Sequence, residues 1–406
     1  MVTRVSPDWL KEPSLIAVFD AIEAAGGEVR VNGGAVRNTL LGEPVADVDL
    51  STTLYPVKVV EALASAGLKS VPTGIEHGTV TAVSGGVGYE VTTLREDVET
   101  DGRRAVVKFA SDWTKDALRR DLTMNALYLS RDGAVFDPLD GEADLRARNV
   151  RFVGDAETRI REDYLRILRF FRFFAWYGQG RPDAVGLKAS AKLKDGLASL
   201  SAERVWAELS KLLAAPDPSR ALLWMRTTGI LTAILPESEK WGIDGIHPLM
   251  AAEKAYGWQP DAIRRLEVII PPRDEVVERL AKRLKVPNIV RSRLKAWANG
   301  VQMIQLDTPK NVRAALYYGR KNPDAVFDQV KLKIAASTED QDALSRLLEA
   351  ATDFDVPELP VKGQDLLDAG FDPGAVLGEK LKMLEDSWVQ SDFTLDRDAL
   401  LALAKA

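Results

Sequence analysis

The chain has 406 residues, a length that predicts roughly two to four structural units rather than one domain. Hydrophobic residues make up 46% and charged residues 28%, with no long uncharged apolar stretch, so composition excludes a disordered or helical membrane-spanning chain. The chain has no cysteine and only two histidines, which excludes a thiol nucleophile and argues against a structural zinc site or a Ser-His-Asp hydrolase. The formal net charge of −6 argues against a protein whose whole surface binds nucleic acid.

The predicted elements change in kind along the chain. Residues 14–25 have the pattern of a helix, and β-branched segments bounded by glycine predict strands at 28–32, 47–51, 78–83, 89–94, 126–130 and 134–137. Ser84–Gly88 and Arg131–Gly133 are predicted hairpin turns. From about residue 155, proline and glycine separate amphipathic helices such as 201–213, 219–233 and 275–285. The predicted fold is therefore an α+β N-terminal part with a mixed or antiparallel sheet, followed by an all-helical remainder.

The first candidate site lies at the start of the predicted sheet. A strand enters Gly33 and Gly34 and opens a helix carrying Arg37, whose N-terminal N–H groups suit a phosphate. Asp47 and Asp49 lie two residues apart on the next predicted strand, so their side chains share a face. Two such carboxylates can bridge two Mg²⁺ ions about 3.5–4 Å apart, as nucleotidyl transfer requires. A structural Gly-Gly turn beside an exposed Asp pair is the alternative.

A third carboxylate, Glu90, lies on the predicted strand 89–94, which we expect to pair in the same sheet. Its side chain either faces the metals or is an ordinary exposed strand glutamate, and the sequence leaves both readings open.

The segment from Arg161 to Phe174 predicts a buried helix with a row of polar residues at steps of three: Asp163, Arg166, Arg169 and Arg172. Buried arginines must meet carboxylates or an anionic ligand in a cleft. The alternative is a row of ion pairs on an exposed face. An aspartate acceptor beside an arginine donor also complements the edges of cytosine and adenine, which predicts a preference for CTP and ATP.

Three basic segments follow in the helical part, at 279–285, 291–295 and 310–321. They form either local nucleic-acid-binding stripes or solvated helix faces that acidic residues balance elsewhere.

Taken together, these motifs resemble the class II tRNA nucleotidyltransferase and bacterial poly(A) polymerase superfamily. The match runs through residues 28–240 and includes the segments Thr73–Val80, Glu90–Arg95, Arg119–Leu127, Asp137–Pro138 and Glu203–Leu213. The resemblance implies a nucleotidyltransferase head (1–145), a helical neck with the base-selecting helix (146–215), a helical body (216–290) and a helical tail that binds tRNA (291–406).

The resemblance also implies residue roles. Asp47 and Asp49 hold Mg²⁺ and form the catalytic set with Glu90. The nucleotide-binding residues are Gly33, Gly34, Arg37 and Arg120 toward the triphosphate or sugar, and Asp163 with Arg166 toward the base, supported by Arg169 and Arg172. Asn38 stands where the family motif usually has Asp, so we do not assign it to metal binding.

The implied activity is template-independent addition of CCA to the tRNA 3′ end from CTP and ATP, with Mg²⁺ as cofactor and pyrophosphate as the second product. The loop between Arg95 and Lys115 is full length, unlike in CC-adding relatives, and the chain lacks the long basic extension of poly(A) polymerases. A poly(A) polymerase, an A-adding or CC-adding enzyme, and a non-catalytic RNA-binding relative stay open as alternatives. No signal-peptide core or membrane segment is recognised, so we expect a cytoplasmic protein and assume a monomer.

Overall fold

The computed structural model describes residues 2–100, 105–239, 241–303, 305–337 and 341–405. The chain divides into two compact units, Met1–Ile234 and Leu235–Ala406. The expected division into head, neck, body and tail stays a prediction. Short 3₁₀ helices supplement the regular elements at Asp8–Lys11, Ile75–His77, Thr123–Asn125, Lys194–Ser199 and Pro236–Ser238.

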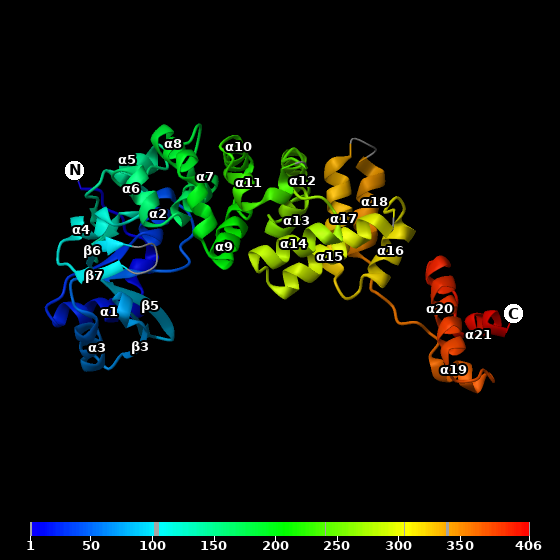
Figure 1. The fold of residues 1–406 in the computed structure, drawn as a ribbon. Helices are drawn as coiled ribbons and strands as arrows, with labels where there is room; N and C mark the ends of the chain where they lie inside the picture. The colour runs from blue at the N-terminus through cyan, green and yellow to red at the C-terminus, as the bar shows by residue number, and fades with distance from the viewer. Residues whose placement is uncertain (1, 101–104, 240, 304, 338–340, 406) are drawn as a thin grey trace. The chain divides into compact units, whose positions relative to one another are not determined.

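A seven-stranded sheet forms the start of the first unit, in the order β3-β4-β5-β2-β1-β8-β9 (Figure 1). The strands are β1 (Val29–Asn32), β2 (Leu50–Thr52), β3 (Lys69–Gly74), β4 (Thr79–Ser84), β5 (Val87–Thr93), β8 (Tyr128–Leu129) and β9 (Val135–Phe136). β2 and β5 are parallel and the other neighbours antiparallel, so the predicted mixed sheet is confirmed. Helices α1 (Pro13–Ala24) and α3 (Pro56–Ser65) pack against it through fully buried side chains such as Phe19 and Leu63.

The hairpin expected at Ser84–Gly88 joins β4 and β5, with Ser84 opposite Val87. Its two central residues, Gly85 and Gly86, have φ values of 57° and 81°. Two positive φ angles are the requirement of a type I′ turn, which glycine meets at little steric cost.

Two sequence predictions about strands were wrong. The strand expected at 47–51 begins only at Leu50, so Asp47 and Asp49 precede it. A separate two-stranded sheet, β6 (Arg95–Thr100) and β7 (Ala105–Phe109), occupies the segment expected to be a loop. Residues 101–104 of that segment lie outside the described residues.

The remaining helices of the first unit are α2 (Gly34–Leu41), α4 (Trp113–Leu118), α5 (Gly141–Arg146), α6 (Ala156–Glu162), α7 (Leu165–Tyr177), α8 (Ala184–Lys192), α9 (Ala202–Leu213), α10 (Ser219–Thr227) and α11 (Ile230–Ile234). The helix expected from Arg161 to Phe174 is therefore interrupted. Asp163 has extended backbone angles (φ −157°, ψ 107°), and its carboxylate accepts a hydrogen bond from the Leu165 N–H at 3.1 Å. A short acidic side chain that bonds its own neighbouring backbone competes with helix continuation, which explains the break.

The regular elements of the second unit are all helices within its described residues, as the sequence predicted. Its helices are α12 (Ile246–Tyr256), α13 (Ala262–Glu267), α14 (Asp274–Leu284), α15 (Asn288–Met303), α16 (Pro309–Tyr318), α17 (Pro323–Ala336), α18 (Gln341–Thr352), α19 (Gly363–Asp368), α20 (Ala375–Gln390) and α21 (Arg397–Lys405). No helix in the described part of the chain is long and apolar enough to cross a membrane.

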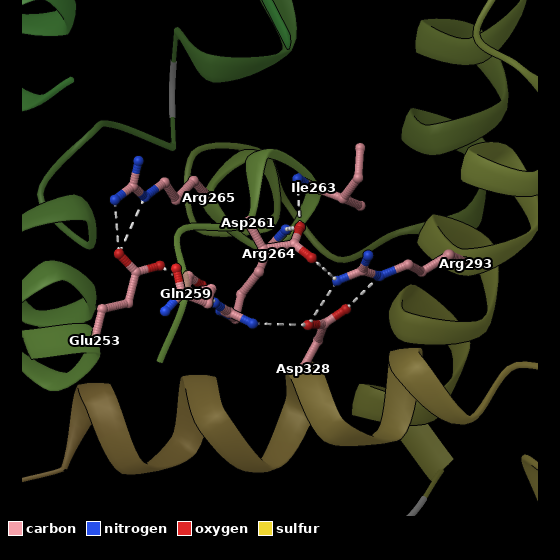
Figure 2. A network of polar contacts seen from close by, with 8 residues as sticks. All are labelled: Glu253, Gln259, Asp261, Ile263, Arg264, Arg265, Arg293 and Asp328. Carbon is pink, nitrogen blue, oxygen red and sulfur yellow. Dashed lines mark hydrogen bonds and ion pairs between the residues drawn. The ribbon is translucent and has the colours of Figure 1, made fainter. Parts of the chain in front are cut away.

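A buried charged network joins helices of this unit (Figure 2). Arg293 on α15 donates to both carboxylate oxygens of Asp328 on α17, at 2.7 and 2.9 Å, and to Asp261 at 2.9 Å. Arg265 on α13 donates to Glu253 on α12 at 2.7 Å. Because an unpaired charge is costly in the interior, these pairs restrict how the helices can pack.

Much of the basic charge of this unit is paired within it. Arg291 and Lys295 both contact Glu278, at 2.5 and 2.6 Å, and Arg283 contacts Glu237 at 2.6 Å. These contacts favour the balanced-face interpretation for those residues.

Candidate active site

A cavity of about 500 Å³ in the first unit brings most of the predicted site residues together. The sheet side contributes the Gly33–Gly34 turn, Asp49 and Glu90, and the opposite wall contributes the start of α7. The predicted residues along its wall are Gly33, Gly34, Arg37, Asp49, Glu90, Arg120, Asp163, Arg166 and Arg169. Asp47 and Arg172 are not among the described lining residues.

The acidic side of the cavity follows from strand register. Leu50 of β2 is paired with Val91 of β5, two neighbouring inner strands of the sheet. The residues before them, Asp49 and Glu90, are therefore neighbours as well. Asp49 is exposed at the cavity wall, but the protein around it removes part of its hydration and raises its pKa; the negative charges of Glu90 and Asp47 raise the pKa further, whereas Arg120 lowers it. The neighbouring carboxylates thus disfavour the ionised form of Asp49, an effect that a bound cation would relieve.

These carboxylates fit Mg²⁺ as part of a site that the phosphates of a bound substrate complete. Within the described residues, no group of three or more acidic or histidine side chains is spaced to hold a metal ion by itself. Mg²⁺ keeps several waters and commonly binds through one or two carboxylates plus substrate phosphates. Asp47 and Asp49, with Glu90 beside them, therefore fit a metal that binds together with a triphosphate rather than a preformed cage.

The Gly33–Gly34 turn presents a helix N-terminus to the cavity. Gly33 has φ 61° and ψ −113°, and its N–H donates to the Leu127 carbonyl at 3.1 Å. Because this φ is positive, a side chain at Gly33 would be strained, and its Cβ would lie in contact with Nη1 of Arg120 at 3.4 Å. Helix α2 begins at Gly34, which leaves its first N–H groups available to an anion.

Arg37 is buried behind this turn. Its guanidinium donates to Oδ1 of Asn125 at 2.5 Å and to the Tyr177 hydroxyl at 2.9 Å, and it lies 4.4 Å from the centre of the Tyr177 ring. Burial lowers its pKa. Asn38 belongs to the same cluster, because its Oδ1 accepts from Arg37 Nε at 3.2 Å and its Nδ2 donates to the Pro44 carbonyl at 2.7 Å. Asn38 thus has a structural explanation without a metal.

Arg120 lies close to Asp49 in the same cavity. It pairs with the buried Asp116 at 3.2 Å and donates to Oδ1 of Asn32 at 3.1 Å and to the Tyr128 hydroxyl at 3.1 Å. These contacts fix a positive charge close to Asp49, whose pKa it lowers.

The predicted arginine row meets carboxylates, as expected for buried arginines. Arg166 pairs with Glu162 at 2.5 Å, Arg169 with Asp121 at 2.5 Å and Arg172 with Glu208 at 2.6 Å. These side chains are 13%, 32% and 16% exposed, so the alternative of an exposed row of ion pairs was wrong.

Asp163 is held by a residue that sequence reasoning gave no role. Arg204 on α9 donates to its Oδ2 at 2.6 Å, while Oδ1 accepts from the Leu165 N–H. Asp121 lies in the segment Arg119–Leu127 and Arg204 in the segment Glu203–Leu213. No sequence periodicity links Asp121 to Arg169, 48 residues away, or Arg204 to Asp163, 41 residues away. Only the folded chain shows these pairs.

Two family models match the chain. A "Poly A polymerase head domain" matches residues 29–151, and a "Probable RNA and SrmB- binding site of polymerase A" matches residues 185–241. A mitochondrial CCA tRNA nucleotidyltransferase 1 of Mus musculus is 35% identical over 389 residues, covering 93% of this chain and 86% of the relative. A CCA-adding enzyme of Leuconostoc mesenteroides is 31% identical over 394 residues, covering 96% of this chain and 94% of the relative.

A solved structure has the same fold along almost the whole chain. The crystal structure of a Bacillus stearothermophilus CCA-adding enzyme in complex with CTP superposes with a TM-score of 0.78 at 25% identity, covering 97% of both chains.

Proposed function

Because the chain belongs to the family of CCA tRNA nucleotidyltransferases and CCA-adding enzymes, we propose that it adds C, C and A to the 3′ end of tRNA from CTP and ATP. One observation carries the proposal: a single cavity is lined by Asp49, just before β2, and Glu90 on β5, and also by Asp163 and Arg166 at the start of α7. A triphosphate and its base can therefore be bound at opposite walls of the same site.

In the proposed reaction the 3′-hydroxyl of the RNA attacks the α-phosphate and pyrophosphate leaves. Asp47 and Asp49 would hold Mg²⁺, which supplies positive charge for the triphosphate and lowers the pKa of the attacking hydroxyl. Glu90 adds a third carboxylate close to Asp49. The N–H groups at the start of α2 and the guanidinium of Arg120 bind and orient the triphosphate.

Arg37 supports this wall from behind. Because its donors already bind Asn38, Asn125 and Tyr177, it contributes positive charge and holds the start of α2 against α7. Its charge is available to the phosphates through the cavity wall that it lines.

Base selection is proposed for Asp163 and Arg166, which still have hydrogen-bonding capacity. A carboxylate offers about four acceptor sites, and Asp163 uses one for Leu165 and one for Arg204. Arg166 uses Nη1 for Glu162 and the Arg159 carbonyl and one Nη2 hydrogen for the Arg119 carbonyl. Its Nε–H and second Nη2 hydrogen have no acceptor among the described residues. An acceptor and donors of this kind complement the amino group and ring nitrogen that cytosine and adenine share.

Arg169 and Arg172 keep the base-reading pair in position, since Arg169 ties α7 to Asp121 and Arg172 ties it to Glu208 on α9. The tail, residues 291–406, is proposed to bind the tRNA body, and the protein is proposed to act as a cytoplasmic monomer.

Incubation of a tRNA transcript lacking its 3′ CCA with labelled CTP, ATP or both, in the presence of Mg²⁺, tests the function. We expect two C residues with CTP alone and a complete CCA end with both nucleotides. Long products with ATP alone would instead support a poly(A) polymerase, the activity after which the family that matches residues 29–151 is named. Addition of A only to a transcript ending in CC would indicate an A-adding enzyme, and addition that stops after CC would indicate a CC-adding enzyme. No incorporation, with retained RNA binding, would indicate a non-catalytic relative.

A further inference from the structure

A second, smaller cavity of about 230 Å³ lies directly beside the candidate active site. The two cavities share Arg37 and Phe173 in their walls. The smaller one is completed by residues of α7 and α9, namely Arg172, Trp176, Tyr177 and Lys211. None of the last three belongs to the predicted site.

This side cavity carries excess positive charge. Arg37, Arg172 and Lys211 line it, and Arg172 is paired with Glu208 at 2.6 Å. Lys211 forms no ion pair with any described residue and is exposed. The cavity therefore attracts an anion that the protein itself does not supply.

The other lining side chains are aromatic, and the outermost is held in place. Trp176 is 40% exposed, yet its indole N–H donates to the Lys211 carbonyl at 2.8 Å, which fixes the ring between α7 and α9. The Tyr177 ring lies 6.4 Å from the Trp176 ring, centre to centre, and stacks with Phe173 at 5.8 Å. An exposed aromatic face beside cations is the arrangement with which proteins bind single-stranded nucleic acid, base on ring and phosphate on cation.

We propose that this side cavity binds the 3′-terminal segment of the RNA acceptor, with a base on Trp176 and a phosphate beside Lys211 and Arg172. The inference rests on the proposed function and extends it to the second substrate. The cavity is smaller than the roughly 300–1,000 Å³ that whole small-molecule ligands occupy, so it suits one part of a longer chain.

The shared wall gives the direction of the strand. An RNA end held at Trp176 continues past Phe173 into the larger cavity, where its terminal hydroxyl has to reach the α-phosphate. The incoming triphosphate has its own donors there, at the Gly33–Gly34 turn and Arg120, and does not require Lys211.

The test compares Trp176→Ala, Trp176→Phe and Lys211→Met with wild type in the full chain. CTP incorporation into a tRNA transcript lacking CCA is measured while either the RNA or CTP is varied. We expect Trp176→Ala to raise the KM for RNA about 5- to 160-fold, the range that loss of one base–aromatic stack corresponds to, with the KM for CTP unchanged. Trp176→Phe keeps a ring and should recover most of the affinity, although it loses the indole N–H.

Lys211→Met should also raise the KM for RNA, and it should reduce the slope of log affinity against log salt by about 1, as loss of one phosphate contact does. Lys188→Met is the matched control, because Lys188 on α8 is likewise exposed and lines neither cavity. It should change neither KM nor the salt slope.

Three results would overturn the inference. One is a rise in the KM for CTP rather than for RNA, which would assign the side cavity to the incoming nucleotide. Another is equal loss in Trp176→Ala and Trp176→Phe together with a lower melting temperature, which would make the indole hydrogen bond purely structural. The third is wild-type KM values in all variants. Binding of a 5′-labelled transcript, followed by fluorescence anisotropy, tests the side cavity even if wild type adds no nucleotide, so failure of the proposed function is distinguishable.

Discussion

Replacement of Asp121 by asparagine tests whether the ion pair between Asp121 and Arg169 keeps helix α7 in place. The Asp121 carboxylate accepts from Arg169 Nε at 2.6 Å, from Asn125 Nδ2 at 3.1 Å and from the Leu122 N–H at 2.8 Å. Asn has the same shape and keeps one acceptor oxygen, so the change removes the charge with little change in packing. Arg169 then loses its closest carboxylate.

The expected cost follows from the burial of the two partners. Breaking a fully buried ion pair by removing one partner costs about 3–5 kcal/mol. Asp121 is buried, but the Arg169 side chain is 32% exposed and water can solvate part of its charge. We therefore expect the free energy of unfolding to fall by about 1.5–3 kcal/mol, somewhat below the fully buried range. The KM for CTP and ATP should rise as well, because α7 carries Arg166.

The pH dependence of this effect has a definite sign. Burial raises the pKa of Asp121, but the charge of Arg169 and the hydrogen bonds from Asn125, Arg169 and Leu122 lower it more, so the net shift is below the usual 3.8. A carboxyl group whose pKa is lowered by folding stabilises the fold above its unfolded pKa and loses that stabilisation as the pH falls. The difference between wild type and Asp121→Asn should thus be full near neutral pH and shrink as the pH drops below 3.8.

Urea unfolding of the full chain, with hydrogen exchange of residues 165–177 identifying the transition that contains α7, measures this difference. Asp132→Asn is the matched control, because Asp132 pairs with Arg4 at 2.7 Å but both side chains are about 60% exposed (59% and 62%). Water screens that pair, so its loss should leave the transition almost unchanged. Equal effects of the two substitutions, or a difference independent of pH, would refute the reasoning.

Three further predictions concern the carboxylate of Asp49, the proposed base contact of Arg166 and the charged network of the second unit. Asp49→Asn should reduce CTP incorporation by about 10³-fold, because the proposed Mg²⁺ loses a ligand, while the urea unfolding midpoint stays close to that of wild type because Asp49 is exposed; retained incorporation would contradict this. Arg166→Ala should relax discrimination of CTP and ATP from GTP and UTP in single-nucleotide incorporation assays, and unchanged selectivity would refute its role. Arg293→Met should cost the second unit about 3–5 kcal/mol in urea unfolding, because Asp328 loses two hydrogen bonds and Asp261 one, while nucleotide selectivity stays as in wild type.

The elements that the sequence predicted are those with a strong local pattern. Helix α1, the β4–β5 hairpin and helix α9 lie within one or two residues of their expected bounds. Strand β3 escaped prediction because Pro72 interrupts it, and the pairing with β4 shifts register between Val71 and Gly74. Proline is tolerated there because β3 is an edge strand of the sheet, a position that only the assembled sheet defines.

The candidate site shows the same limit. Local spacing identified Asp49, Asp163 and the arginines, because each belongs to a short motif. It placed Asp163 on a helix face, whereas the side chain–backbone hydrogen bond to Leu165 interrupts the helix there. The partners Asp121 and Arg204 could not be predicted, since their contacts join segments more than 40 residues apart.

These long-range contacts connect the two walls of the active-site cavity. Arg169 binds Asp121 at 2.6 Å, Asp121 accepts from Asn125 at 3.1 Å, Asn125 accepts from Arg37 at 2.5 Å, and Arg37 donates to Tyr177 at 2.9 Å. The chain of bonds begins and ends on α7 and passes through α2, so helix α7 and the Gly33–Gly34 turn are held as one body. In the proposed reaction, a base that repositions Arg169 would therefore act on the same hydrogen-bonded body as a triphosphate beside α2. If the proposed roles hold, we expect selection of the base and alignment of the α-phosphate to be coupled, although the two motifs lie more than 100 residues apart in the sequence.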